Sequence, residues 1–177
     1  MIGMYGNVLT SARLTYRLLA EKDKASLRKI LADAENTLPA GFAPVEDEDD
    51  FENFWEKLTA SDTSVALLLD EKLIGYMHFN RYVFLAEPFC NEKNISLGII
   101  LGKEYSGKGY GTKAVTFFTE YLFSFCDNVF GDCFEENIPS LRMFEKSGYV
   151  FYEKYEMYFV GLDKMKSVVS NVKSRPR

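Results

Sequence analysis

The spacing of apolar positions predicts helices and strands along most of this chain. An alternating segment rich in strand formers predicts a first strand over Ala12–Leu18. Apolar residues at helical spacing predict a helix over Ala20–Ala34, and a second helix is predicted to continue to Leu58. Near-continuous apolar runs, typical of central strands, then predict three strands: Ser64–Leu69, Leu73–Phe84 and Ile95–Leu101.

The second half of the chain predicts regular alternation of helix and strand. A helix is expected over Tyr110–Phe125, a strand over Asn128–Glu135, and a short helix over Asn137–Lys146 that ends just before Gly148, a common helix-ending residue. The last predicted strand is Tyr149–Val160. The order β-α-α-β-β-β-α-β-α-β indicates an α/β fold: one mixed sheet with helices on both of its faces.

The two ends of the chain differ from its middle. Residues 1–11 are predicted to be a loose leader, and residues 12–162 one domain, which suits a chain of 177 residues. Residues 163–177 carry five basic side chains and one acidic one. We expect this basic tail to be a helical or frayed, solvated appendage, with a partner-binding strip as the alternative.

An acidic stretch, Glu46–Glu52, contains six acidic residues in seven. Negative charge stabilises the N-terminus of a helix, so the stretch is predicted to be the first turn of the helix that continues to Leu58. The alternative interpretation is an acidic rim that attracts a cationic substrate.

Charge and composition exclude several classes of protein. The net charge of −5 and the pI of about 5.1 argue against a general binder of nucleic acid or membrane surfaces. The longest apolar run, Val65–Leu69, is far shorter than the ~20 residues that span a bilayer. Three cysteines without CxxC spacing predict reduced thiols in a cytoplasmic protein. Since His78 is the single histidine, no protein-bound metal is expected.

The segment between the third of these apolar strands and the next helix is rich in glycine. Gly107, Gly109 and Gly111 let the backbone approach a ligand closely and adopt positive φ. Free N–H groups at a helix N-terminus form an anion-binding nest, to which Lys108 adds a cation and Thr112 a hydroxyl. The loop therefore predicts a phosphate or pyrophosphate site.

Two other phosphate-binding loops fit this segment less well. Gly102–Lys108 has the spacing of a P-loop, but Gly109 stands where that loop needs a hydroxyl to bind Mg²⁺. The dinucleotide fingerprint needs the spacing GxGxxG, whereas this loop has GxGxG. A purely structural glycine turn is a further alternative. The pattern favours the pyrophosphate loop of acyl-CoA-dependent N-acetyltransferases.

Two motifs resemble the GNAT superfamily. The loop 105–114 is similar to its [Q/R]-x-x-G-x-[G/A] signature, and 137–149 is similar to its N-x-x-S-x-x-x-[Y/F/L]-x-K-x-G-[F/Y] helix. Residues 17–23 and 73–75 also resemble the branch that acetylates the N-termini of ribosomal proteins. The resemblance covers residues 12–160. It implies the GNAT fold and transfer of an acetyl group from acetyl-CoA to a primary amine.

The resemblance also implies which residues bind the cosubstrate. The backbone of Ile99 and Leu101 would bind the pantetheine arm, and the N–H of Leu101 would polarise the thioester carbonyl. Asn137 would contact the cosubstrate and could also cap its helix. The full predicted set is Ile99, Leu101, Ser106, Gly107, Lys108, Gly109, Tyr110, Gly111, Thr112, Asn137 and Ser140.

Three positions depart from the pattern of the family. Ser106 stands where Gln or Arg is usual, Phe144 where many members have a tyrosine acid, and Ser96 where the ribosomal branch often has a glutamate base. Substitute bases are therefore sought elsewhere. The catalytic candidates are Leu101, His78, Glu135, Glu136 and Ser96.

The missing acid and base leave two functions open. Direct attack of a neutral amine on acetyl-CoA is feasible, because a thiol with a pKa of roughly 8.5 is a fair leaving group and because holding amine and thioester together lowers the barrier. The alternative is a non-catalytic acyl-CoA-binding or partner-binding module. The acceptor stays open among a protein N-terminus, a polyamine, an aminoglycoside and an amino acid. A homodimer paired through the last strand is also expected.

Overall fold

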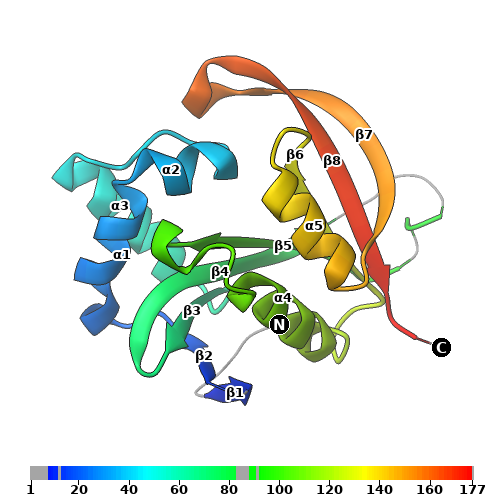
Figure 1. Ribbon diagram of the computed structural model, residues 1–177, viewed down its shortest axis with the longest axis horizontal. Coiled ribbons are helices and arrows are strands. Elements are labelled where there is room, and N and C mark those ends of the chain that lie inside the picture. The colour runs from blue at the N-terminus through cyan, green and yellow to red at the C-terminus, as the bar shows by residue number, and fades with distance from the viewer. Residues whose placement is uncertain (1–7, 12, 83–87, 91, 177) are drawn as a thin grey trace.

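The computed structural model describes residues 8–11, 13–82, 88–90 and 92–176. They form an eight-stranded sheet in the order β1-β2-β3-β4-β5-β6-β8-β7 (Figure 1). Among these strands β5 and β6 run parallel, and every other neighbouring pair is antiparallel. The strands are β1 (Leu9–Ser11), β2 (Leu14–Leu18), β3 (Ser64–Leu69), β4 (Lys72–Tyr82), β5 (Asn94–Leu101), β6 (Asn128–Phe134), β7 (Val150–Phe159) and β8 (Lys164–Ser174).

Helices pack on both faces of the sheet, as predicted. On one face α1 (Lys24–Leu31) and α3 (Glu48–Thr59) bury Leu27 and Trp55 against strand residues such as Ile100. On the other face α4 (Tyr110–Leu122) and α5 (Ile138–Lys146) bury Phe118 and Phe144 against residues such as Leu97. Because side chains alternate between the two faces of a strand, neighbouring residues of β5 reach different cores. The predicted α/β class with one mixed sheet is confirmed.

Short elements were missed near the N-terminus. The predicted helix over 20–34 is a 3-10 turn followed by α1, and a separate short helix α2 (Ala34–Thr37) runs into a second 3-10 turn, η2 (Leu38–Ala40). Leu9–Ser11 pairs with β2, so the leader prediction is wrong for these residues. Residues 1–7, the predicted strand start at Ala12 and the predicted strand end at 83–84 lie outside the described residues.

The prediction of a solvated basic tail is wrong. Lys164–Ser174 forms β8, which lies between β6 and β7 and pairs with both. The basic side chains of this segment flank an uncharged centre in which Val168, Val169 and Val172 are buried. The basic net charge of residues 163–177 hid the strand pattern, because the charged residues lie at the two ends of β8 and its centre is uncharged.

The acidic stretch begins α3, as its helix interpretation predicted. The Asp47 side chain caps the helix by accepting hydrogen bonds from the N–H groups of Asp49 at 2.8 Å and Asp50 at 3.2 Å. Glu52 accepts from Lys24 of α1 at 2.6 Å. These acids therefore join α3 to α1 and stabilise its first turn. Within the described ranges, no helix has the length and apolar character needed to cross a membrane.

The parallel pair β5 and β6 separates after a short contact. The two strands are in register at Asn94 with Asn128 and up to Ser96 with Phe130, and the pairing ends there. Their closed end is fixed by buried amides, since Asn128 donates to Asn94 Oδ1 at 2.9 Å and accepts from Ser174 at 2.6 Å. Beyond this point β6 stays paired with β8, so the sheet opens between β5 and β6.

Candidate active site

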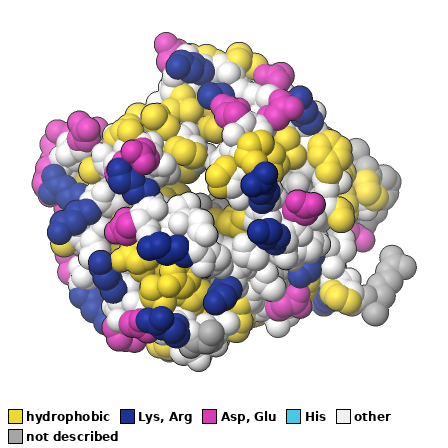
Figure 2. Space-filling model, in the orientation of Figure 1, with side chains coloured by type: hydrophobic (Ala, Val, Ile, Leu, Met, Phe, Trp, Pro, Cys, Tyr) yellow, Lys and Arg dark blue, Asp and Glu magenta, His cyan; other side chains and the backbone are white. Residues whose placement is uncertain are grey.

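A cleft of about 1160 Å³ lies at the opening between β5 and β6. Its walls are Gly98–Leu101 of β5, Asp132–Phe134 of β6, the glycine loop before α4, and one side of α5. In the space-filling view the molecule is hollowed near its centre, with Lys and Arg side chains around the hollow (Figure 2). The separation of two strands therefore supplies a large cavity beside the predicted motifs.

The open edge of β5 presents backbone groups to this cleft. The N–H of Gly102 donates to the carbonyl of Ile74 on β4 at 2.9 Å. Because successive N–H groups of a strand point to opposite sides, the N–H groups of Leu101 and Ile99 point away from β4. They face the opening, where β6 no longer pairs. An extended ligand can hydrogen-bond to such an edge as an added strand does.

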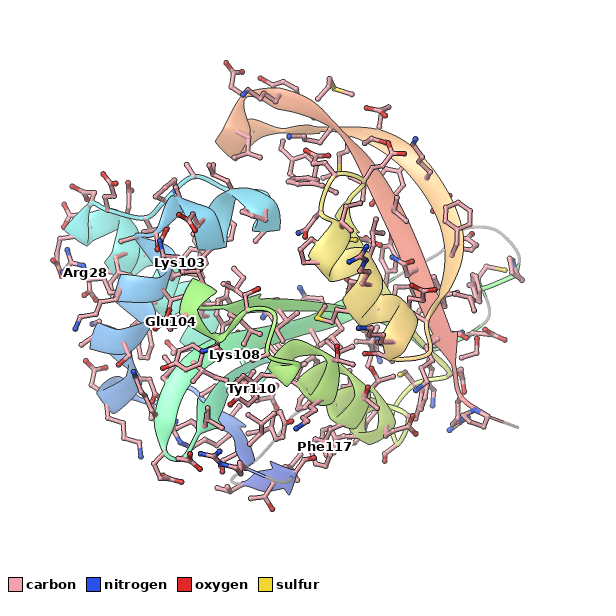
Figure 3. The ribbon with its side chains drawn as sticks, viewed as in Figure 1. Arg28, Lys103, Glu104, Lys108, Tyr110 and Phe117 are labelled. Atoms are coloured by element: carbon pink, nitrogen blue, oxygen red, sulfur yellow. The ribbon has the colours of Figure 1, made fainter. Side chains whose placement is uncertain are left out.

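The glycine loop ends in an open cradle at the start of α4. Gly107 and Gly109 have φ values of +70° and +81°, and a Cβ added at either would meet no heavy atom within 4 Å. The first N–H groups of α4 have no partners within the helix. Figure 3 shows Lys108 and Tyr110 at this end of the helix. Exposed N–H groups with open space before them fit a pyrophosphate.

The helix α5 closes the cleft opposite the loop. Asn137 caps it, accepting from the N–H of Ser140 at 3.2 Å, and also donates to the carbonyl of Pro39 in η2 at 3.3 Å. Arg142 and Lys146 lie one helical turn apart and both line the cleft. These two cations were not predicted, although their four-residue spacing within the 137–149 motif could have indicated them.

A family model described as an acetyltransferase (GNAT) domain matches residues 13–150. The chain belongs to the GNAT acetyltransferase family. Its predicted family resemblance is thereby confirmed, and acetyl-CoA is the cosubstrate of this GNAT protein. The open cradle and the free edge of β5 lie on the same cleft, which suits an extended molecule with a diphosphate.

Known proteins resemble this GNAT protein over most of its length. The uncharacterised N-acetyltransferase YnaD of Bacillus subtilis is 28% identical over 144 residues, covering 79% of this chain and 81% of YnaD. Spermidine N-acetyltransferase from Vibrio cholerae, solved with CoA and spermine, has a TM-score of 0.75 at 17% identity, covering 93% and 96% of the two chains. Ribosomal-protein-S5-alanine acetyltransferase from Vibrio fischeri has a TM-score of 0.73 at 16% identity, covering 96% and 100%. At such low identity these structures share the fold, so the predicted branch stays a prediction.

The GNAT cleft brings most of the predicted cosubstrate residues together. The predicted residues that line it are His78, Ile99, Leu101, Ser106, Gly107, Gly109, Gly111, Thr112, Asn137 and Ser140. Lys108 and Tyr110 belong to the loop without lining the cleft: Lys108 is exposed, and Tyr110 packs against the core under α4. Ser96, Glu135 and Glu136 also lie outside its walls, which bears on the choice of base.

His78 lines the cleft with both of its ring nitrogens engaged. Asn80 Nδ2 donates to His78 Nε2 at 2.8 Å, and His78 Nδ1 lies 2.8 Å from the hydroxyl oxygen of Ser64. Burial lowers the pKa of His78, so the ring is neutral at pH 7. With Nε2 accepting and Nδ1–H donating, the ring has no free lone pair to receive a proton.

Glu135 and Glu136 lie outside the lining of the cleft and are paired with lysines. Glu135 accepts a hydrogen bond from Lys154 at 2.7 Å, and Glu136 pairs with Lys166. These hydrogen bonds lower the pKa of both carboxyl groups, which makes them weaker proton acceptors. Ser96 pairs with Phe130 at the last position of the strand pair and does not line the cleft. The structure does not favour the predicted base role of Glu135 and Glu136, because both are paired with lysines of β7 and β8 and neither lines the cleft.

The cleft passes through the sheet and has a second side, away from the glycine loop. Ser96 and Phe130 are in register, so Asp132 and Phe134 share the face of β6 that looks toward α1 and α3. Tyr155, Met157 and Phe159 of β7 and Phe42 after η2 complete this wall. We call this wall the acceptor side. Residues of the acidic stretch 46–52 are not among those that line this wall, so the structure does not support the acidic-rim interpretation.

Gly109→Ala is expected to weaken CoA binding. A left-handed conformation costs a residue with a side chain roughly 1–2 kcal/mol, which distorts the first turn of α4 and its N–H groups. The dissociation constant of CoA, measured by isothermal titration, should rise about 5- to 30-fold.

Gly161→Ala is the matched control, since Gly161 has ordinary φ and a Cβ there would meet nothing closer than 3.6 Å. Equal affinities for CoA in wild type and both variants would show that the cradle does not hold the diphosphate.

Proposed function

We propose that this protein transfers the acetyl group of acetyl-CoA to a primary amine by direct attack of the amine on the thioester. The observation that carries the proposal is the open edge of β5, which continues into the glycine cradle along one cleft. The cradle would hold the diphosphate and the edge of β5 the pantetheine arm, which leaves the thioester at the opening between β5 and β6.

The residues of the cleft would then do three things. The N–H of Leu101 would donate to the thioester carbonyl and stabilise the negative charge that develops on its oxygen. The second side of the cleft would admit the amine opposite the cosubstrate. Holding the two reactants in contact can supply roughly 7–11 kcal/mol in well-oriented cases. Phe144 lines the cleft where a tyrosine acid is usual, so the thiolate would leave without a tyrosine donor at that position.

Direct attack is favoured over a covalent acyl-enzyme by the state of Cys133. This thiol lines the cleft on β6, and burial raises its pKa to about 12. The nucleophilic form of cysteine is the thiolate, which is scarce at neutral pH for such a group. Cys133 would therefore remain a protonated, packed side chain.

Cys133→Ala is accordingly expected to keep acetyl transfer within about threefold of wild type, because the thiol is not the nucleophile. The measurement is release of CoA thiol with a fixed amine at saturating acetyl-CoA. Cys126→Ala is the control, since Cys126 is also buried with a pKa raised to about 12 but does not line the cleft. A selective loss of more than ~100-fold in the Cys133 variant, with CoA binding intact, would indicate an acyl-cysteine intermediate.

The proposal is tested by binding and turnover measured together. Isothermal titration should detect acetyl-CoA and CoA, and ATP should not displace them. Thiol release should follow with at least one amine among 2-phenylethylamine, spermidine, kanamycin and an alanine-initiated peptide. No binding at millimolar CoA removes the proposal. Binding without thiol release from any of these amines supports the non-catalytic acyl-CoA-binding module instead.

Two further expectations stay predictions. A cytoplasmic location is expected from the composition. A homodimer paired through β7 is expected because this strand ends the described sheet and exposes Val150 and Phe151, at 64% and 65% of their surface. Light scattering on the purified protein would measure the dimer.

A further inference from the structure

Asp132 stands out on the acceptor side of the cleft because it lacks a cationic partner. In the described part of the chain its carboxylate makes no ion pair, and it accepts a hydrogen bond from the Tyr155 hydroxyl at 3.3 Å. Glu35 also lines the cleft, but its carboxylate accepts from Lys103 at 3.2 Å. Asp132 is thus the acid of this wall whose charge is left for a ligand.

The groups around Asp132 are neutral or acidic. Tyr82 faces it from β4, Tyr155 and Glu153 from β7, and Ser170 from β8. Lys166 lies over the Phe134 ring, but its ammonium is paired with Glu136. Desolvation raises the pKa of Asp132, while the hydroxyls of Ser170 and Tyr155 act to lower it. The Asp132 side chain is exposed to solvent at the cleft, and a carboxylate without a counter-ion there can bind an ammonium group and accept a proton from it.

Aromatic and apolar side chains line the cleft together with this carboxylate. Phe134 and Phe159 meet edge to face with centroids 4.8 Å apart, and both line the cleft with Met157 and Phe42. Next along β6, Phe130 packs against Tyr82 with centroids 5.3 Å apart. Such walls bind the carbon body of an amine by burial, and aromatic faces also attract its cationic head. A polycation would need further unpaired acids in the cleft: Glu153 lies near Tyr155 but does not line the cleft, and Glu35, which does, is paired with Lys103.

We propose that Asp132 binds the ammonium group of a compact primary amine with an apolar body and then takes its proton. This inference rests on the proposed acetyl transfer. The substrate class it names is a monocationic amine such as 2-phenylethylamine, rather than a polyamine or an aminoglycoside.

The proposed transfer conserves protons and electron pairs. The ammonium group gives one proton to the Asp132 carboxylate, and the freed nitrogen lone pair forms a bond to the thioester carbon. The carbon–sulfur bond then breaks, and its electron pair leaves on the sulfur of CoA. The new amide nitrogen loses its remaining extra proton to that thiolate, which gives the amide and CoA thiol. Asp132 returns its proton to water.

The first experiment compares Asp132→Asn with Glu156→Gln, using thiol release from acetyl-CoA with 2-phenylethylamine. Glu156 is an exposed acid on β7 that does not line the cleft, so its variant removes the same charge without touching the site. Asp132→Asn should lower kcat/KM by about 10²- to 10⁴-fold, as loss of a general base does. Glu156→Gln should stay within twofold, and both variants should bind CoA like wild type.

A pH profile separates a proton acceptor from a merely structural residue. The acidic limb of kcat/KM should report Asp132, because a protonated carboxyl group cannot accept a proton. Tyr155→Phe removes a hydrogen bond that lowers the pKa of Asp132, so this limb should move to higher pH. In Asp132→Asn the limb should disappear from the residual activity.

The outcomes distinguish this inference from the function beneath it. CoA binding with thiol release that is equal in wild type and Asp132→Asn overturns the role of Asp132 and keeps the acetyltransferase. Faster turnover of spermidine or kanamycin than of 2-phenylethylamine overturns the substrate class, as does thiol release with neither 2-phenylethylamine nor n-hexylamine. Failure to bind CoA at all overturns the proposed function itself.

Discussion

Removal of residues 163–177 is expected to leave a chain that does not fold. The deletion takes away β8, which pairs with β6 on one side and β7 on the other. Three buried valines, Val168, Val169 and Val172, leave the core with it. At about 1.5–3 kcal/mol for each buried side chain, their loss alone approaches the ~5–15 kcal/mol by which a typical domain is stable. Circular dichroism and thermal melting should show no cooperative transition.

A shorter deletion provides the control for this experiment. Ending the chain after Arg175 keeps β8 whole, together with the Arg175 N–H bond to the Asp127 carbonyl at 2.7 Å. This control should melt like the full chain and bind CoA with equal affinity. A longer deletion that still unfolds cooperatively and binds CoA would contradict the insertion of β8 into the sheet.

Local patterns sufficed to predict most of the sheet and the cosubstrate side of the cleft. The predicted strand Ser64–Leu69 matches β3, and the predicted strand Ile95–Leu101 matches β5 to within one residue. Both could be predicted because a strand buried on both faces is apolar along its length. Gly107 and Gly109 could be assigned because positive φ is a property of the single residue and its neighbours. These features require no knowledge of which distant segments meet.

What was missed depends on contacts between distant segments. β8 was taken for a solvated tail because basic residues at its two ends hid its apolar centre, and because its pairing with β6 joins segments far apart in the chain. Asp132 becomes part of the acceptor side only because β6 leaves β5 after Phe130 and because Tyr155 comes from another strand. The ion pair of Glu135 was missed for the same reason, since its lysine partner is 19 residues away on β7.

A backbone ester at Leu101, which replaces its N–H by oxygen, is expected to abolish most of the acetyl transfer and leave the fold intact. This N–H points away from β4 into the opening, so no hydrogen bond of the sheet depends on it. The leucine side chain, which packs partly against the core, is kept by this change. Loss of one donor to the developing oxyanion typically lowers kcat by about 10²- to 10³-fold.

The same ester placed at Ile100 is the matched control for Leu101. The Ile100 ester should destabilise the fold and spare catalysis, whereas the Leu101 ester should slow catalysis and spare the fold. The N–H of Gly102 donates to the Ile74 carbonyl of β4 at 2.9 Å, and the N–H of Ile100 points to the same side of β5. The Ile100 ester therefore removes a hydrogen bond between β5 and β4 and should lower the melting temperature. Its kcat should change much less than that of the Leu101 ester, measured by thiol release below both melting transitions. CoA affinity should fall only modestly in the Leu101 ester, since most of the cosubstrate is held elsewhere in the cleft.

An unchanged kcat in the Leu101 ester would mean that another group polarises the thioester carbonyl. The thioester would then not lie at the end of β5.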